Sequence, residues 1–369
     1  MIDTILIPLD GSPLAEQGLH TARGLARETG AALLLLTARP FSMLSGADER
    51  EKERIALRKT QQYLQRTRQA LESQGFTVRV QMMPGNAVSA ILFTAEAEAD
   101  RIGLISMATH GHTGLRHALL GSVAAAVVRE STTPLLLTRA AGRSNPPEVT
   151  PYQRILVALD GTPFAETALR FLAAHRLGRA GELMLLRVVT REPIWPLPMG
   201  YAGNEAVMFY QQAREVTERD QQEADEYLRS LGAAQLPGWT WKPVVALDDP
   251  AAAILEAART GQADLIVLAT HARQGLDRLL HGSVAHEVLK RAEIPVLLLH
   301  GPVGAGEAPE TDLAAARSTP SESVGEPIAA GQVASSEIPQ YSRHLHKREV
   351  DPMAGWQSHG AASSSGILY

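Results

Sequence analysis

An internal duplication constrains this 369-residue chain more than any other feature of its sequence. Three motifs recur in the same order: Ile5-Leu-Ile-Pro-Leu-Asp-Gly-Ser-Pro13 returns as Ile155-Leu-Val-Ala-Leu-Asp-Gly-Thr-Pro163, the loop from Ala108 to Val123 returns from Ala269 to Val284, and Thr133-Pro-Leu-Leu-Leu137 returns as Ile294-Pro-Val-Leu-Leu298. Solenoid repeats span only about 20–50 residues, so a repeat of this length indicates whole domains. The sequence therefore predicts two homologous domains.

Each half alternates short apolar segments with amphipathic ones. Leu33-Leu-Leu-Leu-Thr37 is a continuous apolar run, as expected of a central strand that is covered on both faces. Such alternation predicts an α/β fold of two tandem Rossmann-like, doubly wound domains, each with a five-stranded parallel sheet and helices on both faces. The expected strands are Ile2–Leu9, Leu33–Thr37, Thr77–Met82, Arg101–Met107 and Leu135–Thr138, then Ile155–Leu159, Leu183–Val189, Thr240–Ala246, Leu265–Ala269 and Val296–His300.

Composition places the domain boundaries. We assign 1–140 to the first domain, 141–152 to a linker and 153–300 to the second domain. From Gly301 onward Ala, Ser, Gly, Pro and Glu dominate and no sustained apolar period survives, so 301–369 is expected to be a disordered, low-complexity tail. The N-terminus has no basic leader, and no apolar run approaches the ~18 residues of a membrane span. These features lead us to expect a cytoplasmic protein that does not bind membranes.

The duplicated loop is the strongest indication of function. It follows an apolar strand and opens a helix at Ser122, which we expect to be the N-cap residue. The free N–H groups and the dipole at a helix N-terminus favour an anion, and glycines such as Gly111 and Gly121 let the backbone approach it, with positive φ at little cost. One such loop fits a structural N-cap best, but its duplication favours a phosphate site.

Asp10 ends the first strand, and the loop follows the fourth. In a doubly wound sheet, ligands bind beyond the carboxyl ends of strands where the winding reverses. If those two strands are neighbours, Asp10 and Gly121-Ser122 face one crevice, where the carboxylate could accept hydrogen bonds from an adenine amine or a ribose hydroxyl. The alternative is that Asp10 only caps the turn of Asp10-Gly-Ser-Pro13.

Composition and the histidines exclude or disfavour other chemistries. The chain has no cysteine, which excludes disulfides, thiolate metal sites and cysteine nucleophiles and fits a reducing compartment. A formal charge of −5 gives no general electrostatic reason to expect nucleic-acid binding. His110, His112 and His117 crowd one loop, but only His110 has a counterpart, His271. We therefore favour Mg²⁺ carried by nucleotide phosphates over a metal held by histidines.

Together these motifs resemble the universal stress protein family, over about residues 1–300. The resemblance implies an ATP site in one branch of the family, and paired domains. Here the pairing would be an intramolecular pseudo-dimer joined along Leu135–Thr138 and Val296–His300, with a homodimer left open. Carried over by motif position, the two pockets comprise Pro8, Leu9, Asp10, Ala38, Ala108, Gly111, Gly121, Ser122 and Val123, and Ala158, Leu159, Asp160, Val188, Ala269, Ala272, Gly282, Ser283 and Val284.

The ATP-binding branch carries G-x-x-G, nine residues, then G-[ST], and this chain departs from that pattern. Ala108 replaces the first glycine in the first half, and Ala269 and Ala272 replace both early glycines in the second. We therefore expect the first pocket to bind adenine nucleotide more tightly. A regulatory nucleotide-binding protein is the favoured function, and no catalytic residue is assigned. The alternatives are a slow ATPase or phosphotransferase, disfavoured because neither loop carries a lysine, and a ligand-free dimerising scaffold.

Overall fold

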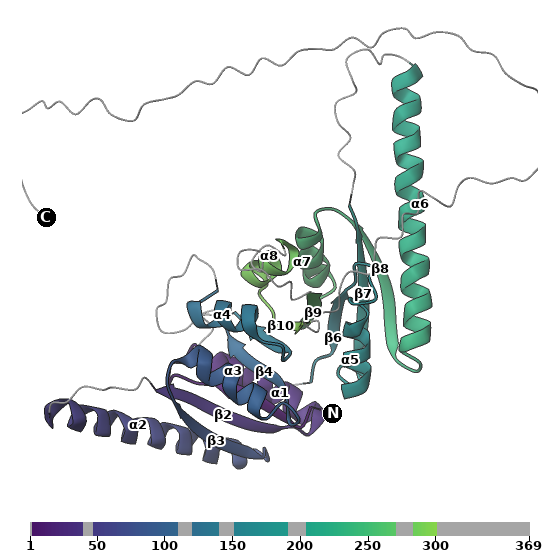
Figure 1. Cartoon of the computed structure of the whole chain (residues 1–369). Helices are drawn as coiled ribbons and strands as arrows, with labels where there is room; N and C mark the ends of the chain where they lie inside the picture. The colour runs from purple at the N-terminus through teal and green to yellow at the C-terminus, as the bar shows by residue number, and fades with distance from the viewer. Residues whose placement is uncertain are drawn as a thin grey trace, which may run out of the picture. The chain divides into compact units, whose positions relative to one another are not determined.

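The computed structural model describes residues 2–39, 47–109, 120–139, 151–190, 204–270 and 283–300. Figure 1 shows its helices and strands coloured along the chain. The first half contains β1 (Thr4–Pro8), α1 (Glu16–Thr29), β2 (Ala32–Arg39), α2 (Ala47–Glu72), β3 (Val78–Pro84), α3 (Ala87–Ala97), β4 (Ile102–Ala108), α4 (Ser122–Glu130) and β5 (Leu135–Thr138). The second contains β6 (Arg154–Ala158), α5 (Thr167–His175), β7 (Glu182–Val189), α6 (Asn204–Gln235), β8 (Thr240–Leu247), α7 (Pro250–Thr260), β9 (Leu265–Thr270), α8 (Ser283–Arg291) and β10 (Val296–His300).

The strands form one sheet in the order β3-β2-β1-β4-β5-β10-β9-β6-β7-β8. Pairing is parallel within each half. The fifth strands of the two halves, β5 and β10, pair antiparallel, with Leu136 opposite Leu297. The predicted α/β fold of doubly wound, mainly parallel halves is confirmed. Residues 141–150 of the predicted linker and the C-terminal tail lie outside the described residues, whereas Tyr152 at the end of that linker is buried.

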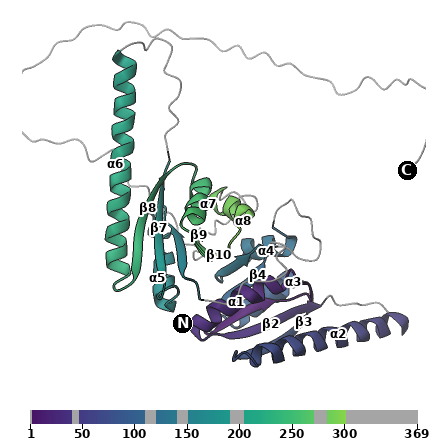
Figure 2. The same cartoon turned by 180° about the vertical axis from the view of Figure 1, so that it is seen from behind.

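Both faces of the sheet are buried, which explains the unbroken apolar runs in its strands. On one face Ile5, Ile7, Leu33 and Leu35 pack with residues of α1 and α2, such as Leu25 and Leu64. On the other face Leu6, Leu34 and Ile105 pack with Ile91 of α3 and Val127 of α4. The second half repeats the arrangement with α5 and α6 on one face and α7 and α8 on the other. Figure 2 shows the elements from behind.

Helix α1 lies unusually close to β4. A Cβ atom on Gly18 would be 2.7 Å from the Cα of Met107, and the buried Ser106 hydroxyl donates to the Gly18 carbonyl at 2.8 Å. Ala168 and Val267 stand at the corresponding places of the second half. The glycine therefore serves close packing in the first half alone.

We predict that Gly18→Ala destabilises the fold by about 1–3 kcal/mol, because the added methyl group forces the helix and the strand apart. Alanine has the higher helix propensity, by about 1 kcal/mol, so propensity alone would change stability in the opposite direction. Urea unfolding followed by circular dichroism measures the difference. An unchanged or raised midpoint would show that α1 can shift without cost.

Candidate functional site

The two strands that frame the candidate site are neighbours, as the sequence analysis required. β1 pairs with β4, with Leu6 opposite Ile105, and β6 pairs with β9, with Leu156 opposite Ile266. From β1 the chain winds to β2 and β3 in one direction, and from β4 to β5 in the other. Each half therefore has a topological switch point at the carboxyl ends of these strands, the usual place for a ligand crevice in such a sheet.

Asp10 follows β1 and is exposed. Its Oδ1 atom accepts the Ser12 N–H at 2.9 Å, and the Ser12 hydroxyl in turn accepts the Ala15 N–H at 3.1 Å. Gly11 between them has φ +82°, where a side chain would be strained. Asp10 therefore does cap the turn, as the alternative interpretation of the sequence expected. Its second oxygen, Oδ2, has no hydrogen-bond partner among the described residues and is free for another donor.

Asp160 makes the same turn in the second half. Its Oδ1 atom accepts the Thr162 N–H at 2.8 Å and the Thr162 hydroxyl at 2.6 Å, and that hydroxyl accepts the Ala165 N–H at 3.1 Å. Asp160 is also exposed. The duplication in sequence therefore extends to the hydrogen bonds that hold the two carboxylates.

The start of α4 corrects one detail of the sequence analysis. The N-cap residue is Gly121, with φ −55°, and Ser122 is the first residue of the helix. The expected serine cap is therefore wrong, and Gly121 does not use positive φ. No side chain caps the helix, and Ser122 is exposed. The Gly121 N–H donates to the Thr109 carbonyl at 2.6 Å, while the next N–H groups have no acceptor among the described residues, as is usual for the first turn of a helix.

Apolar side chains lie beside this helix start. Ala38 at the end of β2 and Val123 in α4 are half-buried and pack against the same core cluster. Met83 stands opposite Ala38 in the register of β2 and β3 and packs against that cluster as well. Sequence reasoning did not single out Met83, because its apolar character marks it only as a core residue. Pro8 and the buried Leu9 and Ala108 complete the described strand ends of the first crevice.

The second crevice has corresponding residues. Ala158 ends β6, the buried Leu159 follows it, Val188 lies in β7 and Ala269 in β9. Ser283 begins α8, and Val284 is half-buried. The remaining predicted residues, Gly111, Ala272 and Gly282, lie outside the described residues, as do His110, His112, His117 and His271.

A tyrosine–glutamate pair beside each aspartate turn was missed from the sequence. The Tyr63 hydroxyl donates to Glu16 Oε1 at 2.9 Å, and the Tyr227 hydroxyl donates to Glu166 Oε1 at 3.2 Å. Burial, the neighbouring carboxylate and this hydrogen bond raise the pKa of both phenols, that of Tyr227 to about 12. The pairs join α2 to α1 and α6 to α5. The sequence did hold one indication of these pairs, because both the tyrosine and the glutamate recur at corresponding positions of the second half.

We predict that Tyr63→Phe destabilises the protein by about 1–2 kcal/mol, because a half-buried carboxylate loses a donor. Tyr227→Phe is the matched variant, and its longer hydrogen bond should cost less. Thermal unfolding of the two variants gives both values. Equal stability of wild type and Tyr63→Phe would mean that water replaces the phenol without loss.

One of the differences between the two crevices changes the charge next to the aspartate turn. In β2 the Thr37 hydroxyl donates to the Leu9 carbonyl at 2.8 Å. Arg187 occupies the corresponding register position of β7. Its guanidinium lies 5.0 Å from the centre of the Tyr227 ring, in a cation–π contact, and a Cβ atom on Gly161 would overlap it. A positive group therefore stands beside the Asp160 turn, whereas a neutral threonine occupies the corresponding position of the first half.

The chain belongs to the universal stress protein family, whose model matches residues 1–139 and again 151–300. It is 30% identical over 205 residues to a universal stress protein of Mycobacterium tuberculosis strain H37Rv, covering 53% of this chain and 61% of that one. It thus spans about three-fifths of that relative's length. A Mycobacterium bovis universal stress protein is 23% identical over 320 residues, covering 81% of this chain and 95% of its own length.

A solved universal stress protein from Archaeoglobus fulgidus DSM 4304 shares the fold, with a TM-score of 0.58 at 20% identity. The match covers 81% of this chain and 99% of the archaeal one. No helix within the described residues is both long and apolar enough to cross a membrane.

Proposed function

We propose that the chain is a regulatory protein that binds adenine nucleotide, ATP in particular, in the crevice at each switch point. The observation that carries this proposal is the uncapped N-terminus of α4 beside the end of β1 and the free Asp10 oxygen. A polar, exposed helix start next to a carboxylate suits a ligand with both an anionic end and a hydrogen-bond donor. A nucleotide has both.

Each part of the ligand has a place among the described residues. The N–H groups at the start of α4 would bind phosphate oxygens, with the helix dipole adding to the attraction. Asp10 Oδ2 would accept a hydrogen bond from the adenine amine or a ribose hydroxyl. Ala38 and Val123 offer apolar surface to the base. Mg²⁺ would be held through the phosphates rather than by a histidine cluster.

A role in regulation fits the site better than catalysis does. Among the described residues at either crevice, the carboxylates of Asp10 and Asp160 are engaged in turns and no lysine lies nearby. Phosphoryl transfer enzymes place lysine, arginine and metal ligands around the transferred group. ATP turnover that Asp10→Ala abolishes would instead support a slow ATPase. The cytoplasmic location expected from the sequence remains a prediction.

We also propose that the two domains act as an intramolecular pseudo-dimer. Support comes from the antiparallel pairing of β5 with β10, in which Leu136 and Leu297 are fully buried. Unpaired apolar strand edges favour association, so pairing them within one chain removes that tendency. A monomeric mass in analytical ultracentrifugation supports this proposal. Rapid hydrogen exchange along β5 and β10 would contradict it, because their antiparallel pairing protects these backbone N–H groups.

Asp10→Asn tests the nucleotide site without disturbing the turn, because the amide oxygen still accepts the Ser12 N–H. We expect at least about a tenfold loss of ATP affinity, since a hydrogen bond to a charged acceptor is worth about 1.5–3 kcal/mol. Calorimetric titration of nucleotide-stripped protein measures it. Asp160→Asn is the matched variant for the weaker site. Unchanged affinities in both variants would remove the carboxylates from the proposed site.

A further inference from the structure

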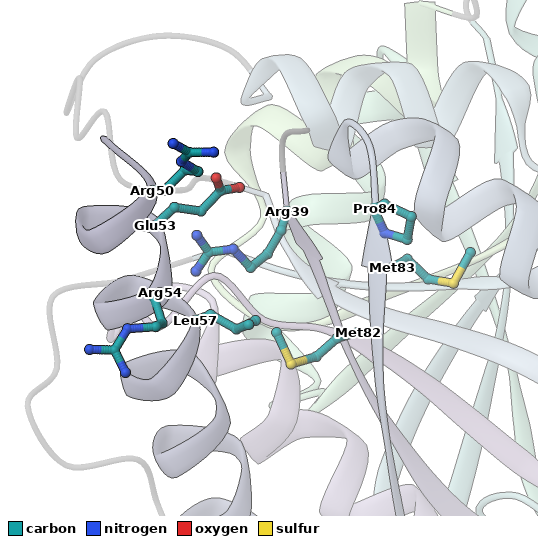
Figure 3. Close-up of a pocket in the computed structure, with 8 residues that line it drawn as sticks. All are labelled: Arg39, Arg50, Glu53, Arg54, Leu57, Met82, Met83 and Pro84. Atoms are coloured by element: carbon teal, nitrogen blue, oxygen red, sulfur yellow. The ribbon is translucent and has the colours of Figure 1, made fainter. Parts of the chain in front are cut away.

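A second pocket lies in the first half, between α2 and the carboxyl ends of β2 and β3. It has a volume of about 420 Å³, and Figure 3 shows its lining residues from β2, β3 and α2: Arg39, Arg50, Glu53, Arg54, Leu57, Met82, Met83 and Pro84. Ligand pockets range over about 300–1,000 Å³, so this one suits a small molecule. It adjoins the carboxyl ends of β2 and β3, but its helical wall is α2, which packs on the other core cluster.

The polar wall carries two guanidinium groups without an acidic partner. Arg39 ends β2, and its Nη1 atom donates to the Thr60 hydroxyl at 3.2 Å, which orients the side chain along α2. Neither Arg39 nor Arg50 forms an ion pair with any described residue. Arg54 differs, because it makes two hydrogen bonds to Glu51, at 2.7 and 2.6 Å. With Glu53 counted against Arg39 and Arg50, the lining retains one net positive charge that an anion could neutralise.

The remaining wall is apolar. Met82 at the end of edge strand β3 lies on the same face of the sheet as Leu57, whose side chain is 39% exposed. Its neighbour Met83 lines the pocket at the strand end and packs against the cluster on the other face. Methionine is flexible and polarisable, so it adapts to ligands of irregular shape. Leu57 and Met82 thus present a partly exposed apolar surface inside the pocket. A ligand with an apolar body would cover it.

The second half shows that the fold does not require these residues. In the register of β7 and β8, Val189 replaces Arg39, and Val245 and Ala246 replace Met82 and Met83. When α2 and α6 are aligned on Tyr63 and Tyr227, Ala224 replaces Thr60 and Gln221 replaces Leu57. The second half thus forms the same sheet and helix without the arginine–threonine contact or the methionines. A purely structural role for the set is therefore disfavoured.

We propose that this pocket binds a small organic monocarboxylate with an apolar body, such as a medium-chain fatty acid. Arginine presents a planar fork of donors that matches a carboxylate, and Arg39 is already oriented by Thr60. The apolar body lies against Met82, Met83 and Leu57. The pocket adjoins the nucleotide crevice at Met83, but its arginines and α2 wall are not part of that crevice, and the proposal does not depend on the function proposed for it.

The test uses the full-length protein and sodium decanoate as the probe, followed by calorimetry below the micelle concentration. We expect saturable binding with a Kd below about 1 mM. The double variant Arg39→Gln/Arg50→Gln should weaken it at least about tenfold, because both carboxylate donors are lost. Leu57→Gln, which introduces the residue that α6 carries, should weaken it severalfold. Thermal midpoints of the variants show whether the fold is retained.

Three controls make the test specific. Arg214→Gln changes an arginine of α6 at the position corresponding to Arg50 and should leave decanoate binding unchanged. Gly121→Asp should also leave it unchanged, which separates this pocket from the nucleotide site. Decanol, which lacks the charge, should bind at least about tenfold more weakly. The absence of saturable binding, equal binding by the double variant, or equal binding of decanol would overturn the proposal.

Discussion

Gly121→Asp is expected to weaken ATP binding in the first crevice by at least about a hundredfold. Gly121 is the N-cap of α4, and no side chain caps the helix. Aspartate is a favoured N-cap residue, so its carboxylate would take the free N–H groups that we assign to the phosphates. Two negative charges at about 4 Å repel by about 4 kcal/mol near a protein surface. The fold should be retained, because the new cap stabilises the helix.

Two comparisons separate the causes. Gly121→Asn introduces a side chain of the same shape without the charge, so a smaller loss than with aspartate identifies repulsion. Gly282→Asp should affect only the weaker of two sites, because the second loop lacks both early glycines of the motif, and alanine costs about 1–2 kcal/mol wherever nucleotide binding requires positive φ. If Gly282→Asp abolished the tighter site and Gly121→Asp left it intact, our ranking of the pockets would be wrong.

Acidification from pH 6.5 to pH 4 is expected to remove about 3 kcal/mol of stability through His300 alone. Burial lowers the pKa of this histidine to about 4, against an ordinary value of 6.5, while a hydrogen bond with the Ser131 backbone partly offsets the effect. The folded state therefore prefers the neutral ring, and the unfolded state binds the proton first. Stability is constant above pH 6.5 and falls by about 1.4 kcal/mol for each pH unit down to pH 4.

His300→Gln isolates this effect from other titrations. Burial raises the pKa values of Glu28 and Asp264, so these groups stabilise the folded protein as the pH falls and oppose the histidine. The difference in unfolding free energy between wild type and His300→Gln, measured in urea from pH 4 to 7.5, cancels them. The wild type should lose stability relative to the variant only below pH 6.5. A difference independent of pH would show that the folded protein protonates His300 normally.

The fold could be predicted from the sequence because apolar periodicity and duplication are local signals. The bounds of β5 and β10 agree with the prediction, since both strands follow a proline and contain only a short apolar run. The start of the first helix was less accurate. A proline such as Pro13 is common in the first turn of a helix, but here the Ser12 hydroxyl caps an intervening turn and α1 begins only at Glu16. The composition of a segment does not show whether a capped turn or the helix itself begins at a given residue.

The candidate site was predictable where it depends on chain order and not where it depends on side chains from distant elements. Asp10 could be placed beside the loop after β4 from topology alone, and the pairing of β1 with β4 agrees. The Tyr63–Glu16 hydrogen bond joins residues 47 positions apart, and Arg187 of β7 contacts the ring of Tyr227 in α6. Such contacts depend on how helices rotate against the sheet, which periodicity does not specify. The Arg39 pocket was missed for the same reason.

Native mass spectrometry of the nucleotide-stripped, full-length chain titrated with ATP tests the central claim most directly. It counts bound nucleotides on each chain without assuming where they bind. We predict a first ATP bound at low concentration, a second at a concentration at least about tenfold higher, and loss of the first in Gly121→Asp. A chain that stays free of nucleotide up to millimolar ATP, or that binds ATP equally with both Gly121→Asp and Gly282→Asp present, would contradict the account.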